Sequence, residues 1–173
     1  VGSTEYAVLK VVHDSSGTLK PGGKVHLDRY RASKPGDMFL LLGNKATELE
    51  WGSPLEVTEK SFNYITQAPS KEAPSIERLA YFVKFLEFSD QIVADDAYGE
   101  FANAQYKDIV AIKDQFPREK LRVWLADPKT VPSRLGLYGL MTGLCGTDED
   151  AEYLKKRLLE PVEGFRLGID GMM

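Results

Sequence analysis

The sequence predicts an α+β protein, in which a small antiparallel β-sheet or partial barrel is followed by an α-α superhelical array. Three observations lead to this prediction. Short stretches with alternating or β-branched apolar residues fill the first sixty or so positions, and turn formers separate them. The segment 67–75, QAPSKEAPS, has two prolines and no large apolar residue, and after it the apolar period changes from two to about 3.6 residues. The helical half then repeats itself at an offset of forty positions.

These observations divide the chain into four parts. Residues 1–66 form a small β-module with a short closing helix, 67–74 form a linker, and 75–160 form the helical repeats. Residues 161–173 form an irregular tail, for which the start of a further repeat is the alternative. We also expect the chain to be a processed or excised portion of a longer protein, because it begins without Met.

Strands are expected at five places in the β-module. EYAVLKVVH at 5–13 is rich in β-branched residues, and KVHLDRY at 24–30 alternates between apolar and polar positions. MFLLLG at 38–43 is continuously apolar, which predicts a strand covered on both faces. Weaker strands are expected at 47–51 and 54–58. The sequence therefore predicts three to five strands, a number that suits a small sheet or an incomplete barrel.

A short helix is expected to close the β-module. Thr58 is a good N-cap residue, and the helix would run to Ile65. Phe62 and Ile65 would then lie against one end of the sheet.

The second half of the chain is expected to be entirely helical. Asp90 and Thr147 are suited to cap the helices that follow them, and Pro117 suits the first position of a helix. The expected helices cover residues 76–88, 91–103, 106–115, 117–126 and 132–144, and a last one begins after Thr147. The first of them carries a wide apolar stripe, as in a helix packed between neighbours: Ile76, Leu79, Ala80, Phe82, Val83, Phe85 and Leu86.

A dipeptide marks the repeat. Tyr98-Gly99 recurs as Tyr138-Gly139, and at the same offset Phe101 falls on Met141. We therefore predict that the two tyrosines hold the same place in successive helical hairpins.

The helical half resembles HEAT repeats over residues 75–160. The residues that carry the resemblance are the turn aspartates Asp90 and Asp127, Arg134 near the start of a second helix, and the closing stretch LYGLMTGLCGTDEDAEYL. The first copy departs from this pattern, because Ala94 stands at the position of Arg134. The resemblance implies an α-solenoid with a concave surface that binds proteins.

The amino-terminal half resembles the OB-like or netrin-like β-modules of secreted proteins, through LKPGGKVHL and KPGDMFLLLG. The arrangement as a whole looks like uncharacterised bacterial envelope proteins that join such a module to HEAT-like helices. The resemblance implies a bacterial periplasmic or cell-envelope location and carries no activity with it.

Charge and hydropathy limit the expected partners. The net charge is −4, and the helical half carries the acidic excess, which argues against nucleic acid because phosphate binding needs a basic surface. Apolar runs such as 38–42 are too short to cross a bilayer, so no membrane insertion is expected. Another protein is the expected partner. A further alternative is that the chain is part of a larger assembly. Cys145 is the one cysteine, so cysteine usage does not indicate a compartment.

Four carboxylates, at Asp90, Asp95, Asp96 and Glu100, are the strongest chemical candidates. Asp96 and Glu100 lie four positions apart on one helical face, a spacing that metal binding or acid–base chemistry could use. The alternative is a solvated face, with one carboxylate paired with Arg78 or Arg134 to fix the geometry between repeats.

Other titratable groups are better explained structurally. His13 and His26 could bind zinc from neighbouring strands, but a third ligand is not evident. The acidic residues that follow Thr147 lack the spacing and the glycine of an EF-hand, and they suit the positive end of a helix dipole. Cys145 has no histidine near it in the sequence and is expected to be a packing residue.

The favoured function is a non-catalytic protein–protein interaction or scaffold module. No catalytic residue, cofactor site or metal site is predicted, and the expected protein-binding residues are Tyr98, Tyr138, Asp96, Glu100 and Arg134. For the tyrosines, the alternative is a place between helices, with the hydroxyl on a turn carbonyl or a carboxylate. Two other functions remain: a metal-assisted hydrolase or lyase that uses Asp96 and Glu100 with His13 or His26, and a structural subunit of a larger assembly.

Overall fold

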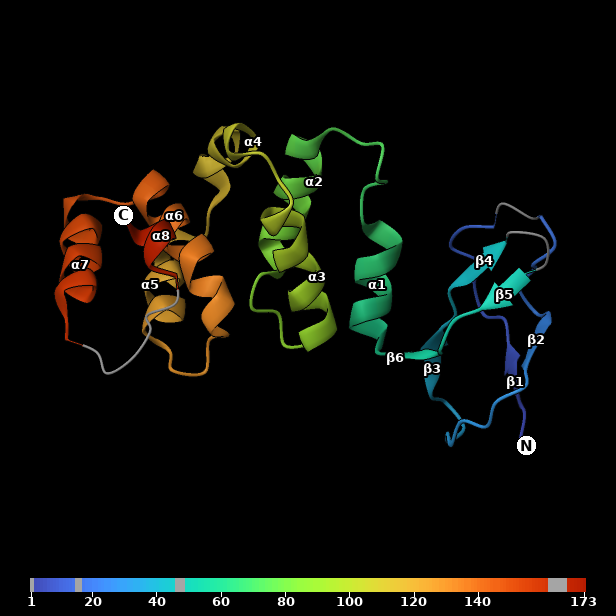
Figure 1. Cartoon of the computed structure of the whole chain (residues 1–173). Coiled ribbons are helices and arrows are strands. Elements are labelled where there is room, and N and C mark those ends of the chain that lie inside the picture. The colour runs from blue at the N-terminus through green and yellow to red at the C-terminus, as the bar shows by residue number, and fades with distance from the viewer. Residues whose placement is uncertain (1, 15–16, 46–48, 162–167) are drawn as a thin grey trace. The chain divides into compact units, whose positions relative to one another are not determined.

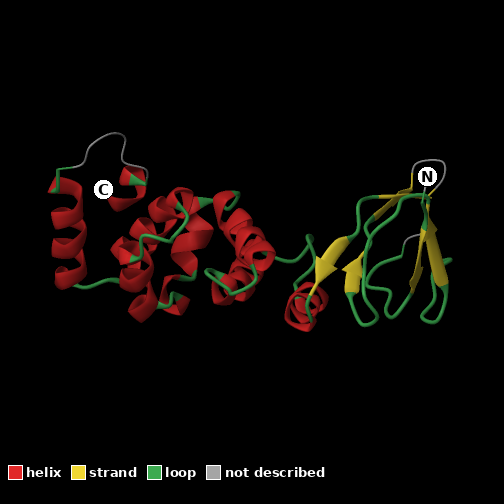
Figure 2. Ribbon diagram, turned by 90° about the horizontal axis from the view of Figure 1, so that it is seen from below, coloured by secondary structure: helices red, strands yellow, loops and turns green. Residues whose placement is uncertain are grey.

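The computed structural model describes residues 2–14, 17–45, 49–161 and 168–173. In this part of the chain the fold is α+β, with eight α-helices and six short β-strands. The chain divides into two compact units, Val1–Gln67 and Ala68–Met173. The first unit contains the strands and one helix, and the second is helical (Figures 1 and 2).

The first two strands form an antiparallel pair. β1 (Thr4–Ala7) pairs with β2 (Lys24–Leu27), with Thr4 opposite Leu27. Val25 and Leu27 are buried while Lys24 and His26 are exposed, so the alternation in the sequence correctly predicts the inward face of β2.

The expected strand at 5–13 is shorter than predicted. The last hydrogen bonds of this ladder are made by Val8 with the glycine turn: Val8 N donates to Gly23 O at 2.9 Å, and Gly22 N donates to Val8 O at 2.8 Å. Beyond Val8 the chain leaves the strand pair. Leu9 is 73% exposed. A β-branched sequence therefore does not become strand where no neighbouring strand is available to pair with it.

The other strands form two more antiparallel pairs instead of joining one sheet. β3 (Met38–Leu40) pairs with β6 (Leu55–Val57), and β4 (Gly43–Lys45) pairs with β5 (Leu49–Trp51). The predicted strand at 38–43 is therefore wrong as one element, because its two ends pair with different partners. It is also not covered on both faces: residues 38–41 are half-buried and Leu42 is exposed.

Helix α1 (Glu59–Gln67) closes the first unit. Its start follows the prediction, since the Ser61 N–H donates to Thr58 Oγ1 at 3.1 Å and the Thr58 N–H donates to Ser61 Oγ at 2.8 Å. This reciprocal pair satisfies backbone donors that the first turn would otherwise leave open.

The second unit contains seven α-helices and three short 3₁₀ segments within its described residues. The elements in chain order are α2 (Ser75–Phe82), η1 (Val83–Phe85), α3 (Gln91–Ala102), α4 (Tyr106–Ala111), η2 (Lys113–Gln115), α5 (Arg118–Ala126), η3 (Pro132–Arg134), α6 (Leu135–Cys145), α7 (Asp148–Leu159) and α8 (Ile169–Met172). The expected helix at 106–115 is thus divided between α4 and η2. The expected helix at 76–88 changes to 3₁₀ geometry and ends at Phe85.

Caps and core follow the sequence closely, with two exceptions. Asp90 Oδ1 accepts a hydrogen bond from Ile92 N at 3.1 Å, as expected for the N-cap of α3. Pro117 is the N-cap of α5 instead of its first helical residue. Ile76 is 47% exposed and does not belong to the buried stripe of α2, whose core residues are Leu79 and Phe82, with Val83 and Leu86 directly after it.

The carboxyl end of the chain packs back on α6. Residues 162–167 lie outside the described part, but α8 follows them and its Met172 is buried. Gly171 approaches Gly136 so closely that a β-carbon there would lie 1.8 Å from the Gly136 carbonyl oxygen. Figure 1 shows α8 beside α6. The tail is therefore not irregular throughout, and glycine at these positions is what allows two backbones to touch.

Candidate functional sites

Arg134 lies at the centre of a buried polar cluster. Its side chain extends from η3 and is fully buried. Nη1 donates to Glu87 Oε1 at 2.7 Å, and Nη2 donates to Asp95 Oδ1 at 2.5 Å. A buried guanidinium is costly unless carboxylates pair with it, and here two of them do. One arginine thus joins η3 to α3 and to the segment after η1.

Tyr138, on α6, completes this cluster. It is fully buried, and its hydroxyl donates to Glu87 Oε1 at 2.6 Å. Its ring centroid lies 5.0 Å from that of Trp124 on α5. Burial raises the pKa of Tyr138 well above its usual range, and the adjacent Glu87 carboxylate raises it further. The phenol is therefore a permanent hydrogen-bond donor at physiological pH.

The backbone of Glu87 is unusual. Its φ is 54°, a left-handed conformation that residues other than glycine rarely adopt. This conformation turns the chain after η1, and the Glu87 carboxylate meets both Arg134 and Tyr138. The two charge-assisted hydrogen bonds offset the cost of the backbone conformation, which is on the order of 1 kcal/mol.

Tyr98 lies in a different environment from Tyr138. Tyr98 is half-buried, its hydroxyl donates to the Ser133 carbonyl at 2.8 Å, and Arg134 Cζ lies 6.0 Å from its ring centroid. The Tyr98 hydroxyl thus reaches forward along the chain to η3, whereas that of Tyr138 reaches back to Glu87. The prediction that the two tyrosines hold equivalent places is wrong, although Phe101 and Met141 are both buried as the offset requires.

The expected protein-binding residues separate into internal and surface groups. Arg134 and Tyr138 are fully buried, so the expectation that they contact a partner is corrected: their polar atoms bond within the fold. Asp96 is exposed on α3. Glu100 is part-buried and pairs with Arg78 of α2, which is the pairing that the sequence offered as the alternative to a chemical role.

The structure brings no metal site together in the part of the chain that it describes. No group of three or more His, Cys, Asp or Glu side chains is placed there to hold an ion. His26 Nε2 lies 3.7 Å from Asp28 Oδ1 with both side chains exposed, and His13 contributes to a pocket wall described below. Cys145 is half-buried, and burial raises the pKa of its thiol, which disfavours the reactive thiolate.

A second ionic cluster, at the start of α7, joins the buried Asp150 to two partly exposed arginines. Asp150 accepts hydrogen bonds from Thr147 N at 2.8 Å and Thr147 Oγ1 at 3.0 Å. The first of these, together with the Asp150 N–H donating to the Thr147 side chain, forms a capping box. Arg118 Nη2 lies 3.1 Å from Asp150 Oδ2, and Arg122 Nε lies 2.5 Å from Asp150 Oδ1. The Thr147 N–H first, and the two arginines further, lower the pKa of Asp150 to about 2 despite its burial. Its carboxylate therefore stabilises the fold by joining α5 to α7.

We expect Asp150→Asn to lower the free energy of unfolding by about 2 kcal/mol at neutral pH, because it weakens the cap and removes the buried charge that pairs with Arg118 and Arg122. The pKa of Asp150 in the folded protein, about 2, lies below the usual 3.8. Its contribution is therefore complete above about pH 4 and is lost as the pH falls toward 2. As the pH is lowered across this range, the urea midpoint of unfolding should fall less steeply for the variant than for the wild type. Asp148→Asn, at an exposed position in the same helical turn, is the control and should follow the wild type.

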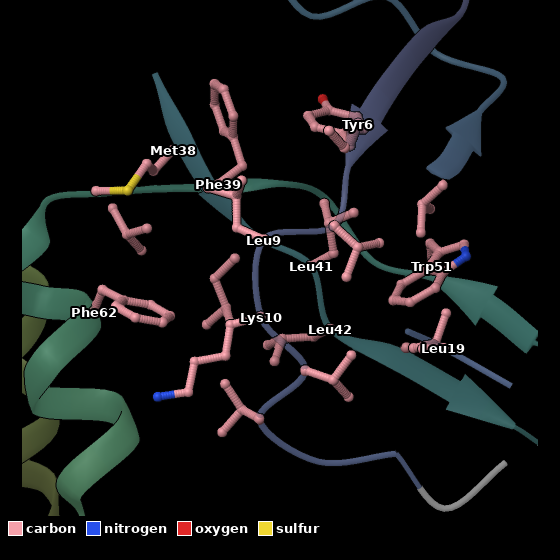
Figure 3. A pocket seen from close by; sticks show the side chains of 18 of the residues that line it. Tyr6, Leu9, Lys10, Leu19, Met38, Phe39, Leu41, Leu42, Trp51 and Phe62 are labelled. Carbon is pink, nitrogen blue, oxygen red and sulfur yellow. The ribbon is translucent and has the colours of Figure 1, made fainter. Parts of the chain in front are cut away.

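A large apolar pocket lies within the first unit. Its volume is about 860 Å³, and β1 with its continuation, β3, β5 and α1 all contribute to its walls. Figure 3 shows side chains that line it, among them Phe39, Leu41, Trp51 and Phe62, with Lys10 at one side. The volume and the predominantly apolar lining are typical of small-molecule sites.

These sites rest on the geometry of this chain alone. No known family model, curated protein or solved structure matches it. No helix among the described residues is long and apolar enough to span a bilayer.

Sequence reasoning missed Glu87, Arg118, Arg122 and the pocket. Glu87 carries no local pattern, since its partners lie 47 and 51 positions away. The pocket did have a signal, the continuous apolar run at 38–42, but such a run also predicts a strand buried on both sides. A run of this kind also arises where a strand faces a cavity.

Proposed function

We propose that this chain is a non-catalytic protein-binding module, in which the helical unit is a HEAT-like array and its partner is another protein. A bacterial periplasmic or cell-envelope location belongs to the same proposal. The packing of α2 with α3 and of α5 with α6, as consecutive helix pairs, supports an array of this kind. The observation that carries the proposal is the outward face of α3.

Helix α3 has a fully packed inner face and an outer face with an exposed apolar residue. Val93, Ala97 and Phe101 are buried, whereas Ile92 is 54% exposed and lies on the same side as Asp96. An isoleucine beside carboxylates suits a partner with an apolar pocket and a basic rim. The half-buried Tyr98 lies on another side of α3, where its hydroxyl donates to the Ser133 carbonyl, so Ile92 and Asp96 form this face without it.

The paired state of the charged groups supports a binding function over a catalytic one. Burial first, and then the Glu87 carboxylate, raise the pKa of Tyr138, whereas hydrogen bonds lower that of Asp150 against the effect of burial, and the hydrogen bonds of both groups hold helices together. Structural ion-pair networks shift pKa values just as active sites do. Glu100, a residue of the hydrolase or lyase alternative, is likewise engaged with Arg78.

The test is a matched pair of surface variants. Ile92→Ser should weaken binding of a protein that co-purifies with the wild-type chain by about tenfold, the loss typical of a central apolar contact. Val123→Ser on α5, where valine is 62% exposed, should leave the affinity unchanged. Affinities measured with the purified partner decide the matter. Equal affinity of wild type and both variants, or the absence of a co-purifying protein from an extract of the source, would contradict the proposal.

A further inference from the structure

We infer that the pocket of the first unit binds an amphiphile with an extended apolar body and one anionic group, the chemistry of a free long-chain carboxylate. This inference does not depend on the protein-binding face of α3, because every residue that lines the pocket lies between Thr4 and Ile65.

The apolar residues of the first unit line this pocket instead of filling a core. Among its described residues, the buried large apolar side chains are few: Val25, Leu27 and Tyr64. Met38, Phe39, Leu41 and Trp51, by contrast, are only half-buried, and all four contribute to the pocket wall. Protein interiors are close-packed, and an apolar space of about 860 Å³ is far larger than ordinary packing defects. An apolar occupant would remove these side chains from water, which stabilises by about 25 cal/mol for each Å² covered.

The polar groups of the wall indicate the charge of the occupant. Three carboxylates line the pocket, and each is already engaged. Glu5 pairs with Lys24 at 2.8 Å, Asp14 accepts from Leu19 N at 2.8 Å, and Asp37 accepts from Lys34 N at 2.6 Å.

Lys10 is different from these groups. Its Nζ lies 5.4 Å from the centroid of the Phe62 ring, and no carboxylate of the described residues pairs with it. Figure 3 shows the Lys10 side chain beside the apolar residues, on the side of the pocket toward α1. A cation next to an apolar cavity favours a ligand whose anionic group binds the ammonium while its apolar body enters the cavity.

Tyr6 is a second, independent polar group of the pocket wall. Its ring packs edge-on against Phe39, with centroids 5.6 Å apart, and it lines the same pocket. Its hydroxyl is buried and has no hydrogen-bond partner in the described part of the chain. An unsatisfied buried hydroxyl costs about 1–3 kcal/mol, and a polar atom of a ligand or a water held with it would remove this cost.

The experiment is a titration of the full chain with dodecanoate below its critical micelle concentration. Isothermal titration calorimetry measures the binding, and the fluorescence of Trp51 in a Trp124→Phe background monitors it independently. We expect saturable binding of one dodecanoate per chain, and affinity at least about tenfold lower for dodecyltrimethylammonium. Lys10→Met should reduce dodecanoate affinity about tenfold and leave dodecanol affinity unchanged. Lys20→Met, an exposed lysine of the same unit outside the pocket wall, is the matched control and should bind as the wild type does.

Several outcomes would overturn the inference. Absence of saturable binding would exclude a ligand site of this kind, and equal binding of the cationic and anionic amphiphiles would exclude the role of Lys10. Binding to phosphatidylglycerol vesicles without binding of free dodecanoate would indicate a membrane surface as the partner. Self-association in sedimentation experiments that Leu41→Asp abolishes would instead show that a second copy covers the pocket. None of these results bears on the Ile92 test, so the two proposals can fail separately.

Discussion

Arg134→Met is expected to lower the free energy of unfolding of the helical unit by about 3 kcal/mol, the largest effect among the single substitutions considered. The guanidinium is fully buried and holds carboxylates from two other segments, at Glu87 and Asp95. Methionine fills a similar volume but leaves Glu87 with one partner, the Tyr138 hydroxyl. The destabilisation is at the lower end for a broken buried ion pair, because both carboxylates keep some access to water.

The unfolding of the helical unit can be followed by itself. Trp124 lies against Tyr138, so its fluorescence in a Trp51→Phe background reports the environment of the cluster. Urea midpoints of Arg134→Met and wild type then give the difference in stability. Lys155→Met removes an exposed pair with Glu152 on α7 and should change stability by less than about 0.5 kcal/mol. If Arg134→Met matched this control, the cluster would not be a main stabilising element of the unit.

Gly171→Ala is expected to detach α8 from α6 and to cost about 2 kcal/mol. A β-carbon at this position would lie 1.8 Å from the carbonyl oxygen of Gly136 and 2.4 Å from its carbonyl carbon. Both are backbone atoms of a helix, so no side-chain rotation can relieve the overlap. The short helix must move away, which exposes Met172 and the surface of α6 that it covers.

A second glycine provides the matched control for this substitution. Gly143 also lies on α6, but a β-carbon there meets no atom within 4 Å. Gly143→Ala should therefore raise stability by about 0.5–1 kcal/mol, since alanine favours the helix. Thermal unfolding gives the sign of each effect, and amide hydrogen exchange on α6 locates the change. Equal shifts for both variants would show that the contact between α6 and α8 does not contribute.

The elements that the sequence predicted well depend on neighbours in the chain. The hydroxyl of Thr58, the carboxylate of Asp90 and the capping box of Thr147 bond within three positions of themselves, so the helix starts could be predicted from local pattern. The alternation in β2 likewise predicted which of its residues are buried. The prediction that 38–43 is a strand covered on both faces is wrong, because its apolar residues line a cavity. Hydrophobicity alone does not distinguish a strand that is buried on both faces from one that faces a cavity.

The candidate sites depend on residues far apart in the sequence. The offset between Tyr98 and Tyr138 is a property of the sequence, but their environments differ because one lies between α3 and η3 and the other faces Glu87. Of the carboxylates singled out on α3, Asp95 and Glu100 have arginine partners 39 and 22 positions away. Which carboxylate pairs with which arginine therefore could not be predicted from spacing.

The amino-acid sequence by itself determined the division of the chain into a β-containing part and a helical part, the helix starts and the inward face of β2. Residues within a few positions of one another fix these features. Only the tertiary structure decided that Glu87, Asp95, Arg134 and Tyr138 meet, that α8 returns to α6, and that the first unit has an apolar pocket beside Lys10. The physical reason is that burial and ion pairing depend on contacts in space, and these contacts join segments that the sequence separates by dozens of residues.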